Sequence, residues 1–218
     1  MASSLRSTEK ADSAEETGRS AQKRKAILDA ATEVFLASGY LGTNMDEIAA
    51  LSGVSKQTIY KHFTSKEALF VEIVTSMSNQ AGDRVGSEPL VFDDGDLKTF
   101  LENYAIRQLT VVVQPRLMQL RRLVIGEVGQ FPDLARALYE AGPKRAMTSL
   151  AELFEQLGKR GLLRVDDPWT AASHYNWLVM SEALNAAMLL GDAAIPPKAQ
   201  LERYARDGVC VFLAAYGA

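Results

Sequence analysis

The residues best suited to recognition chemistry gather in one short polar segment, with the side chains Lys56, Gln57, Thr58 and Lys61. These side chains donate or accept hydrogen bonds, so they suit contacts with base edges and phosphates of DNA. Ala49 is small enough for a second helix to cross over it, and Gly53 permits a tight backbone turn between two short helices. Such a pair forms a helix-turn-helix unit, whose second helix enters the DNA major groove.

Catalytic chemistry has little support in the sequence. His62 and His174 are the two histidines, and no further metal ligand lies at a useful spacing from His62. The single cysteine, Cys210, cannot form an internal disulfide and suits a reducing compartment, where we expect it to be a small buried apolar residue. No nucleophile–base pair, phosphate-binding glycine loop or metal-ligand spacing is present in the sequence, so we expect no enzyme, cofactor or metal site.

The elements that must position the polar segment are helical. Ile27, Ala31, Val34 and Phe35 form one apolar stripe of a helix that we expect to end at Gly39. Asn44 with Glu47 is typical of a capping box that opens a short helix over 45–51. Ser55 caps the next short helix, 56–63, and a longer helix follows from residue 65.

The whole chain is predicted to be all-α, with about nine or ten helices. Of its 218 residues, 1–20 read as a disordered tail, 21–66 as a DNA-binding head of three helices, and 67–218 as a larger effector-binding and dimerisation domain. The run 110–113 is rich in valine and would also suit a strand. Residues 168–191 carry one formal charge but are too polar for a membrane span, so we expect a cytoplasmic protein.

The distribution of charge agrees with a small DNA-reading head. The net charge is −3, yet residues 19–66 hold seven Lys or Arg against four Asp or Glu, a net of +3. Residues 67–218 hold fifteen against nineteen, a net of −4. A basic segment on an acidic body is typical of a small DNA-reading head on a regulatory domain, and ordinary surface variation is the alternative explanation.

The arrangement over 25–73 resembles the DNA-binding head of the TetR family of bacterial transcription regulators. The residues that carry the resemblance are Ala31-x-x-x-Phe35, Gly39-Tyr40, Asp46-x-Ile48-Ala49, Gly53-Val54-Ser55, Ile59-Tyr60-x-His62-Phe63 and Ser65-Lys66-x-x-Leu69. The resemblance implies that Lys56, Gln57 and Thr58 face bases. It also implies that four further residues contact phosphates, namely Thr43, Tyr60, His62 and Lys66.

The C-terminal part resembles the corresponding domain of the AefR-like branch of that family. The matching residues are Leu120-Arg121-Arg122-Leu123-Val124-Ile125-x-Glu127 and Phe131-Pro132-x-Leu134-Ala135. Candidates for an effector pocket are Tyr104, Met118, Arg121, Glu127, Phe131, His174 and Trp177. Core packing explains the aromatic and methionine residues as well, a satisfied core histidine explains His174, and an ion pair explains Arg121 with Glu127.

The function that follows is a dimeric repressor that binds double-stranded palindromic operator DNA and is released by a small, mostly apolar ligand. The helices 168–190 and 198–216 are expected to pair with their symmetry mates in the homodimer. The alternative is a helical small-molecule-binding protein or enzyme in which the basic head is only structural.

Overall fold

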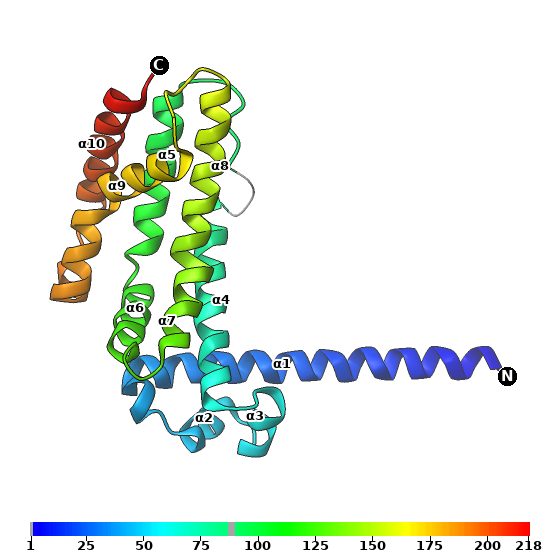
Figure 1. Ribbon diagram of the computed structural model, residues 1–218. Helices are drawn as coiled ribbons and strands as arrows, with labels where there is room; N and C mark the ends of the chain where they lie inside the picture. Colours follow the sequence, from blue (N-terminus) through cyan, green and yellow to red (C-terminus); the bar gives the residue numbers. More distant parts are fainter. Residues whose placement is uncertain (1, 87–89) are drawn as a thin grey trace. The chain divides into compact units, whose positions relative to one another are not determined.

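The computed structural model describes residues 2–86 and 90–218, with side chains over 18–85 and 90–218, and this part of the chain is helical without a β-strand (Figure 1). The elements are α1 (Ala2–Gly42), α2 (Met45–Ser52), α3 (Lys56–His62), α4 (Lys66–Gly86), α5 (Leu97–Val112), α6 (Pro115–Glu127), α7 (Pro132–Tyr139), η1 (Glu140–Lys144), α8 (Arg145–Lys159), α9 (Pro168–Leu190), η2 (Asp192–Ala194) and α10 (Lys198–Tyr216). The chain divides into two compact units between Ile73 and Val74, whereas the sequence places the boundary after residue 66. The predicted all-α class is confirmed.

The first unit is built around an aromatic and aliphatic core. The predicted stripe of α1 is buried, with Ile27 and Ala31 fully enclosed. The ring of Phe35 lies 4.7 Å from the ring of Phe70 on α4, and Tyr40 lies 5.3 Å from Phe70, measured between centroids. Because these rings fix the end of α1 against the start of α4, they hold the segment between them, which contains α2 and α3.

Two expectations about α1 differ from the structure. The segment 1–20 is expected to be a disordered tail, but α1 extends back to Ala2. Ala, Glu, Lys and Arg favour helix, and no proline interrupts this segment, so the local propensity is compatible with a continued helix. Gly39 does not end the helix but kinks it, with φ 74° and ψ 174°, before a further turn that reaches Gly42.

The second unit is a bundle in which α10 packs beside α9 and α5, and α8 packs against α9 (Figure 1). Tyr175 on α9 stands at its centre: the ring contacts Phe154 and Phe212 at 5.5 Å and 5.3 Å, and the hydroxyl donates a hydrogen bond to the Leu101 carbonyl at 2.7 Å. Close approach of α9 and α10 requires Gly208, where an added Cβ would lie 2.8 Å from the Leu178 carbonyl oxygen.

Three further features of the second unit concern the valine run, Cys210 and the membrane. The valine run 110–113 continues α5 as far as Val112, because Val111 and Val113 fill the helical core. Cys210 is exposed on α10, not buried as expected, because Val209 and Phe212 take the inward positions. In the described part of the chain, no helix is long and apolar enough to cross a membrane.

Candidate nucleic-acid interface and ligand cavity

The turn between α2 and α3 is built by three local devices that the sequence predicts. Asn44 caps α2 by accepting a hydrogen bond from the Asp46 N–H at 2.9 Å. Gly53 adopts the left-handed conformation, φ 69°, that an L side chain rarely takes, and ends α2. Ser55 then caps α3 by accepting from the Thr58 N–H at 3.1 Å. The turn therefore fixes the direction in which α3 leaves α2.

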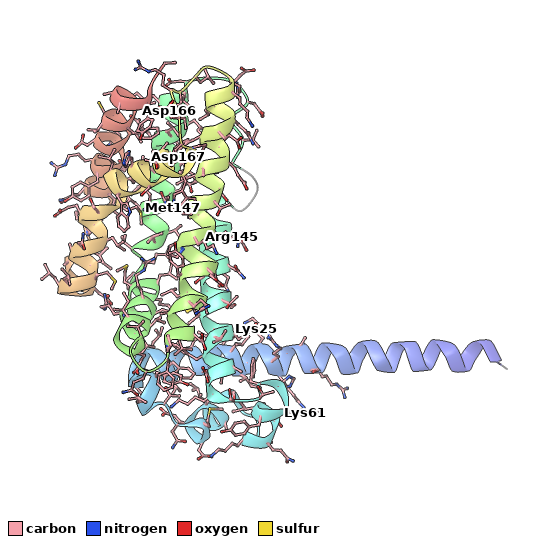
Figure 2. All side chains as sticks on the ribbon, viewed as in Figure 1. Lys25, Lys61, Arg145, Met147, Asp166 and Asp167 are labelled. Carbon is pink, nitrogen blue, oxygen red and sulfur yellow. The ribbon has the colours of Figure 1, made fainter. Side chains whose placement is uncertain are left out.

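One face of α3 is anchored and the other is open. Ile59 is fully buried, and Phe63 is buried directly after the helix. Gln57, Tyr60 and Lys61 are exposed, and Figure 2 shows Lys61 at the surface of α3. Within the described residues, the side chains of Gln57 and Lys61 make no hydrogen bond or ion pair. These groups are accordingly available to an external partner.

Two candidate base-contacting residues have intramolecular partners. The Lys56 ammonium lies 2.9 Å from a carboxylate oxygen of Asp46, and this hydrogen bond raises the pKa of Lys56. The Thr58 hydroxyl lies 2.8 Å from the Ser55 hydroxyl. Since both pairs are exposed, contact with DNA would require these side chains to exchange or share their present partners.

The residues that the resemblance assigns to phosphate contacts differ in their exposure and in their intramolecular partners. Thr43 is buried, and its hydroxyl donates to the Gly39 carbonyl at 2.7 Å. The Lys66 ammonium donates to the Thr43 carbonyl at 2.8 Å, lies 3.4 Å from the Leu41 carbonyl oxygen, and sits 5.0 Å from the centroid of the Tyr40 ring. Lys66 thus secures the segment ahead of α2, whereas Tyr60 is exposed and His62 is half-buried.

The second unit contains a partly open cavity of about 450 Å³. Its wall is formed by residues of α4 to α9 and η1: Ser78, Ala81, Gly82, Val85, Tyr104, Gln108, Val112, Leu117, Leu120, Arg121, Leu138, Tyr139, Ala141, Gly142, Pro143, Arg145, Ala146, Met147, Ser149, Trp169, Ser173, Asn176, Trp177, Met180 and Leu184. The size lies within the range of about 300–1,000 Å³ that is usual for small-molecule sites. The π-helical turn η1, which contains Pro143, contributes to the wall, and such turns are frequent at functional sites.

The cavity includes three of the candidate pocket residues, Tyr104, Arg121 and Trp177. The structure does not bring the other four into it. Met118 is fully buried and packs with Leu184 and Ala187, and Glu127 and Phe131 lie at the end of α6 and ahead of α7. His174 is exposed, neither a core residue nor a cavity residue, with Nδ1 2.6 Å from the Tyr216 hydroxyl.

The sequence left open an ion pair between Arg121 and Glu127 as the alternative to a pocket role. No such ion pair is present within the described residues. It is the neighbour Arg122 that is paired: its guanidinium lies 2.5 Å from Asp192 and also donates to the Ala187 carbonyl at 2.8 Å. Gln119 donates to the same Asp192 carboxylate at 2.6 Å, and both bonds lower the pKa of Asp192.

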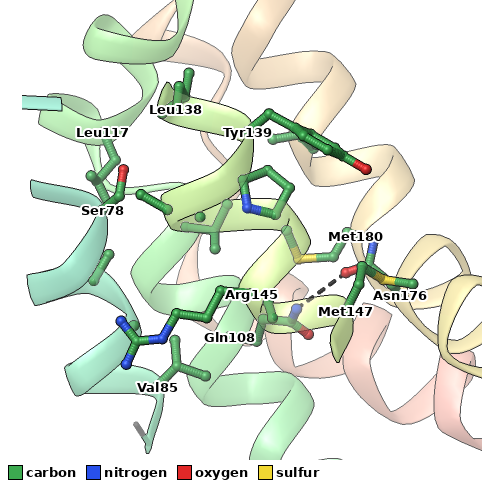
Figure 3. A pocket seen from close by; sticks show the side chains of 18 of the residues that line it. Ser78, Val85, Gln108, Leu117, Leu138, Tyr139, Arg145, Met147, Asn176 and Met180 are labelled. Atoms are coloured by element: carbon green, nitrogen blue, oxygen red, sulfur yellow. Dashed lines mark hydrogen bonds between the residues drawn. The ribbon is translucent and has the colours of Figure 1, made fainter. Parts of the chain in front are cut away.

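Two polar side chains of the wall, Tyr104 and Gln108 on α5, are buried. Gln108 on α5 donates from Nε2 to the Asn176 Oδ1 on α9 at 3.1 Å, a bond drawn in Figure 3. Burial raises the pKa of Tyr104 to about 12, so this phenol is neutral near pH 7. The sequence reasoning missed Gln108, Asn176 and Arg145. The one signal that could have found Gln108 is its position as a polar residue on the apolar stripe of α5.

Comparison with known proteins agrees with both halves of this description. Residues 27–73 match the family described as bacterial regulatory proteins, tetR family, and residues 99–218 match the C-terminal domain of AefR-like transcriptional repressors. The chain belongs to the TetR family of transcriptional regulators, with a C-terminal domain of the AefR-like type.

Two solved structures match this chain over at least 90% of its length. A TetR-family transcriptional regulator from Mesorhizobium loti superposes with a TM-score of 0.83 at 41% identity, over 92% of this chain and 99% of that one. The flavonoid-responsive regulator FrrA gives a TM-score of 0.75 at 30% identity, over 90% of this chain and 98% of that one.

Matches to curated relatives are shorter. The transcriptional regulator YhgD of Bacillus subtilis is 35% identical over 117 residues, which are 51% of this chain and 61% of YhgD. The transcriptional regulator RutR of Escherichia coli is 46% identical over 52 residues, 24% of each protein. The chain therefore covers less than two thirds of each of these two relatives, and RutR matches over 52 residues only.

Proposed function

We propose that this protein is a dimeric repressor that binds palindromic operator DNA through α3 and is released by a small ligand bound in the cavity of the second unit. The observation that carries the proposal is the outward face of α3, where Gln57, Tyr60 and Lys61 are exposed beside a fixed turn. These side chains offer an amide, a phenol and a cation, which suit base edges and phosphates.

Dimerisation is supported by apolar side chains left exposed near the C-terminus. Leu178, Leu189 and Leu190 on α9 and Val211 on α10 are 41%, 80%, 75% and 53% exposed. A twofold dimer that covers α9 and α10 would bury this surface and present two copies of α3 to the two halves of a palindrome. Substitution of both Leu189 and Leu190 by Asp should then give a folded monomer, which light scattering distinguishes from the wild-type dimer. An unchanged mass would contradict this interface.

Release is supported by the path of α4. This helix begins at Lys66, in the first unit, and lines the cavity with Ser78, Ala81, Gly82 and Val85. A ligand that contacts α4 can favour one of two dimer conformations, of which one places the α3 helices about 34–36 Å apart, one turn of DNA. The name of FrrA describes a flavonoid-responsive regulator, which agrees with a ligand-responsive role for this protein.

Footprinting on the DNA that flanks the protein's own gene tests the proposal. The expected result is protection of a palindrome, in the cytoplasmic salt range, that disappears when Gln57 and Lys61 are both replaced by Ala. A matched control, Lys25→Ala, changes one exposed cation on α1 that already pairs with Asp29 at 2.7 Å. Equal protection by the wild type and the double variant would contradict α3 as the reading helix. In the alternative class, a small-molecule-binding protein with a structural head, no site would be protected at all.

A further inference from the structure

The cavity contains an unsatisfied acceptor. Gln108 is only 3% exposed, and its Nε2 is already engaged with Asn176. Its Oε1 is buried and has no hydrogen-bond partner in the described part of the chain. Buried polar groups in folded proteins are nearly always paired, and an exception in a cavity wall indicates a group that an occupant satisfies. An occupant that satisfies this oxygen needs an O–H or N–H donor.

The cavity also contains a cation without a countercharge. Arg121 is half-buried on α6, and its guanidinium makes no hydrogen bond or ion pair within the described residues. Burial lowers the pKa of Arg121, yet an arginine stays protonated near neutral pH. None of the residues that line the cavity is Asp or Glu, so the wall itself offers no carboxylate.

Two arginines near Arg121 differ from it in having partners. Arg122, the next residue, pairs with Asp192. Arg145, which lines the same cavity (Figure 3), donates to the Asn79 side chain at 3.1 Å and lies 3.7 Å from Asp83. The positive charge of Arg145 is thus compensated within the chain, and that of Arg121 is not.

Much of the remaining wall consists of apolar and aromatic side chains that can adapt to a ligand. It includes Val112, Leu120, Met147, Trp177 and Met180. Methionine thioethers pack favourably against aromatic rings and tolerate different shapes. A ring system would contact these side chains, while its polar substituents would meet the two unsatisfied groups.

We infer that the cavity binds an amphipathic aromatic acid, whose carboxylate pairs with Arg121 and whose hydroxyl or N–H donates to Gln108 Oε1. The inference rests on the proposed function only in taking this acid to be the releasing ligand. Arginine and carboxylate form charge-assisted, often bidentate hydrogen bonds, which select an anion over a neutral isostere. The hydroxyl contact selects against the acid that lacks a donor, because Oε1 would then stay unpaired.

Calorimetric titration of the full-length protein without DNA tests the site. The probes are hydroxybiphenylcarboxylic acid, its carboxamide, and the biphenylcarboxylic acid without the hydroxyl. We expect the wild type to bind the hydroxy acid at least about 30-fold more tightly than the carboxamide, because loss of one partner of a buried charge pair costs at least this factor. We expect a loss of about 10-fold when the hydroxyl is absent.

Three variants assign these preferences to residues. Arg121→Met should remove the preference for the acid, and Arg121→Lys should keep much of it. Gln108→Leu should remove the preference for the hydroxyl but leave the preference for the acid. Arg136→Met is the control, since Arg136 is an exposed arginine of α7 that does not line the cavity, and this variant should change neither preference by more than about threefold. Thermal melts of each variant establish that it is folded.

Several results would overturn the inference: no binding of the hydroxy acid at millimolar concentration, equal affinities for the acid and the carboxamide, or an acid preference that persists in Arg121→Met. Failure of the proposed function is separately visible. If the acid binds through Arg121 and Gln108 but leaves operator affinity unchanged, the site stands and the release mechanism is wrong. If operator DNA is bound but no acid is, the repressor proposal stands and this inference is wrong.

Discussion

The role of Lys66 can be tested by a change that keeps the length of the side chain and removes its charge. In Lys66→Met, the Thr43 carbonyl loses a hydrogen bond of 2.8 Å from an ammonium, and the Tyr40 ring loses a cation 5.0 Å from its centroid. A hydrogen bond to a charged group contributes about 1.5–3 kcal/mol, and a partly exposed cation–π contact about 0.5–1 kcal/mol. We therefore expect Lys66→Met to lower the free energy of unfolding of the first unit by about 2–4 kcal/mol.

Urea unfolding followed by circular dichroism measures this loss, and Lys61→Met is the control. Lys61 is also a cation of the helix-turn-helix region, but its exposed side chain has no partner within the described residues. Its removal should change stability by no more than about 0.5 kcal/mol. Unfolding of Lys66→Met at the wild-type urea concentration would refute the reasoning and leave phosphate contact as the remaining role of Lys66.

Further outcomes are expected for DNA recognition, for helix packing and for the pH dependence of stability. Lys61→Met in both subunits should reduce the slope of log K against log salt by about two units. Gln57→Ala should change the difference in binding free energy between operator sequences by about 1–3 kcal/mol. Binding isotherms on altered operators separate the two effects. Gly208→Ala should lower the free energy of unfolding by about 1–3 kcal/mol, because the added Cβ would lie 2.8 Å from a carbonyl oxygen. The control Gly126→Ala places a Cβ with nothing within 4 Å and should not destabilise the protein. Chemical unfolding measures both changes. The pKa of Tyr104 is raised to about 12 in the folded protein, whereas an unfolded chain releases this proton near pH 10. The free energy of unfolding should therefore fall as the pH rises from about 10 to about 12, and it should fall less in Tyr104→Phe. Thermal melts across this pH range measure the difference.

The helix-turn-helix region could be predicted from sequence because its determinants are local. Asn44, Gly53 and Ser55 each act within a few residues, as a cap, a left-handed turn and a second cap. The apolar spacing of Ile59 and Phe63 fixes the buried face of α3, so the outward face follows by exclusion. The partners of Lys56 and Lys66 did not follow, because Asp46 and the Thr43 carbonyl lie 10 and 23 residues away in the chain.

The cavity was only partly predictable, for the opposite reason. Its wall takes single faces from six α-helices, and no local pattern tells which face borders a void and which borders a neighbour. Met118 and Arg121 lie three residues apart on α6, yet one is core and the other lines the cavity. His174 was misplaced because a polar residue among aromatic neighbours suits the core by type, whereas its position on α9 faces outward.

The central claim is that occupation of the cavity and binding of operator are coupled. Calorimetric titration of the hydroxybiphenylcarboxylic acid, with and without the footprinted operator, measures that coupling directly. Linkage requires that the operator weaken the acid by the same factor by which the acid weakens the operator, and a coupling of about 1–3 kcal/mol gives about 5- to 150-fold. We predict that the wild type loses acid affinity by a factor within this range when operator is present. Arg121→Met should show no such loss. Equal affinities of the wild type for the acid in the two titrations would contradict the account.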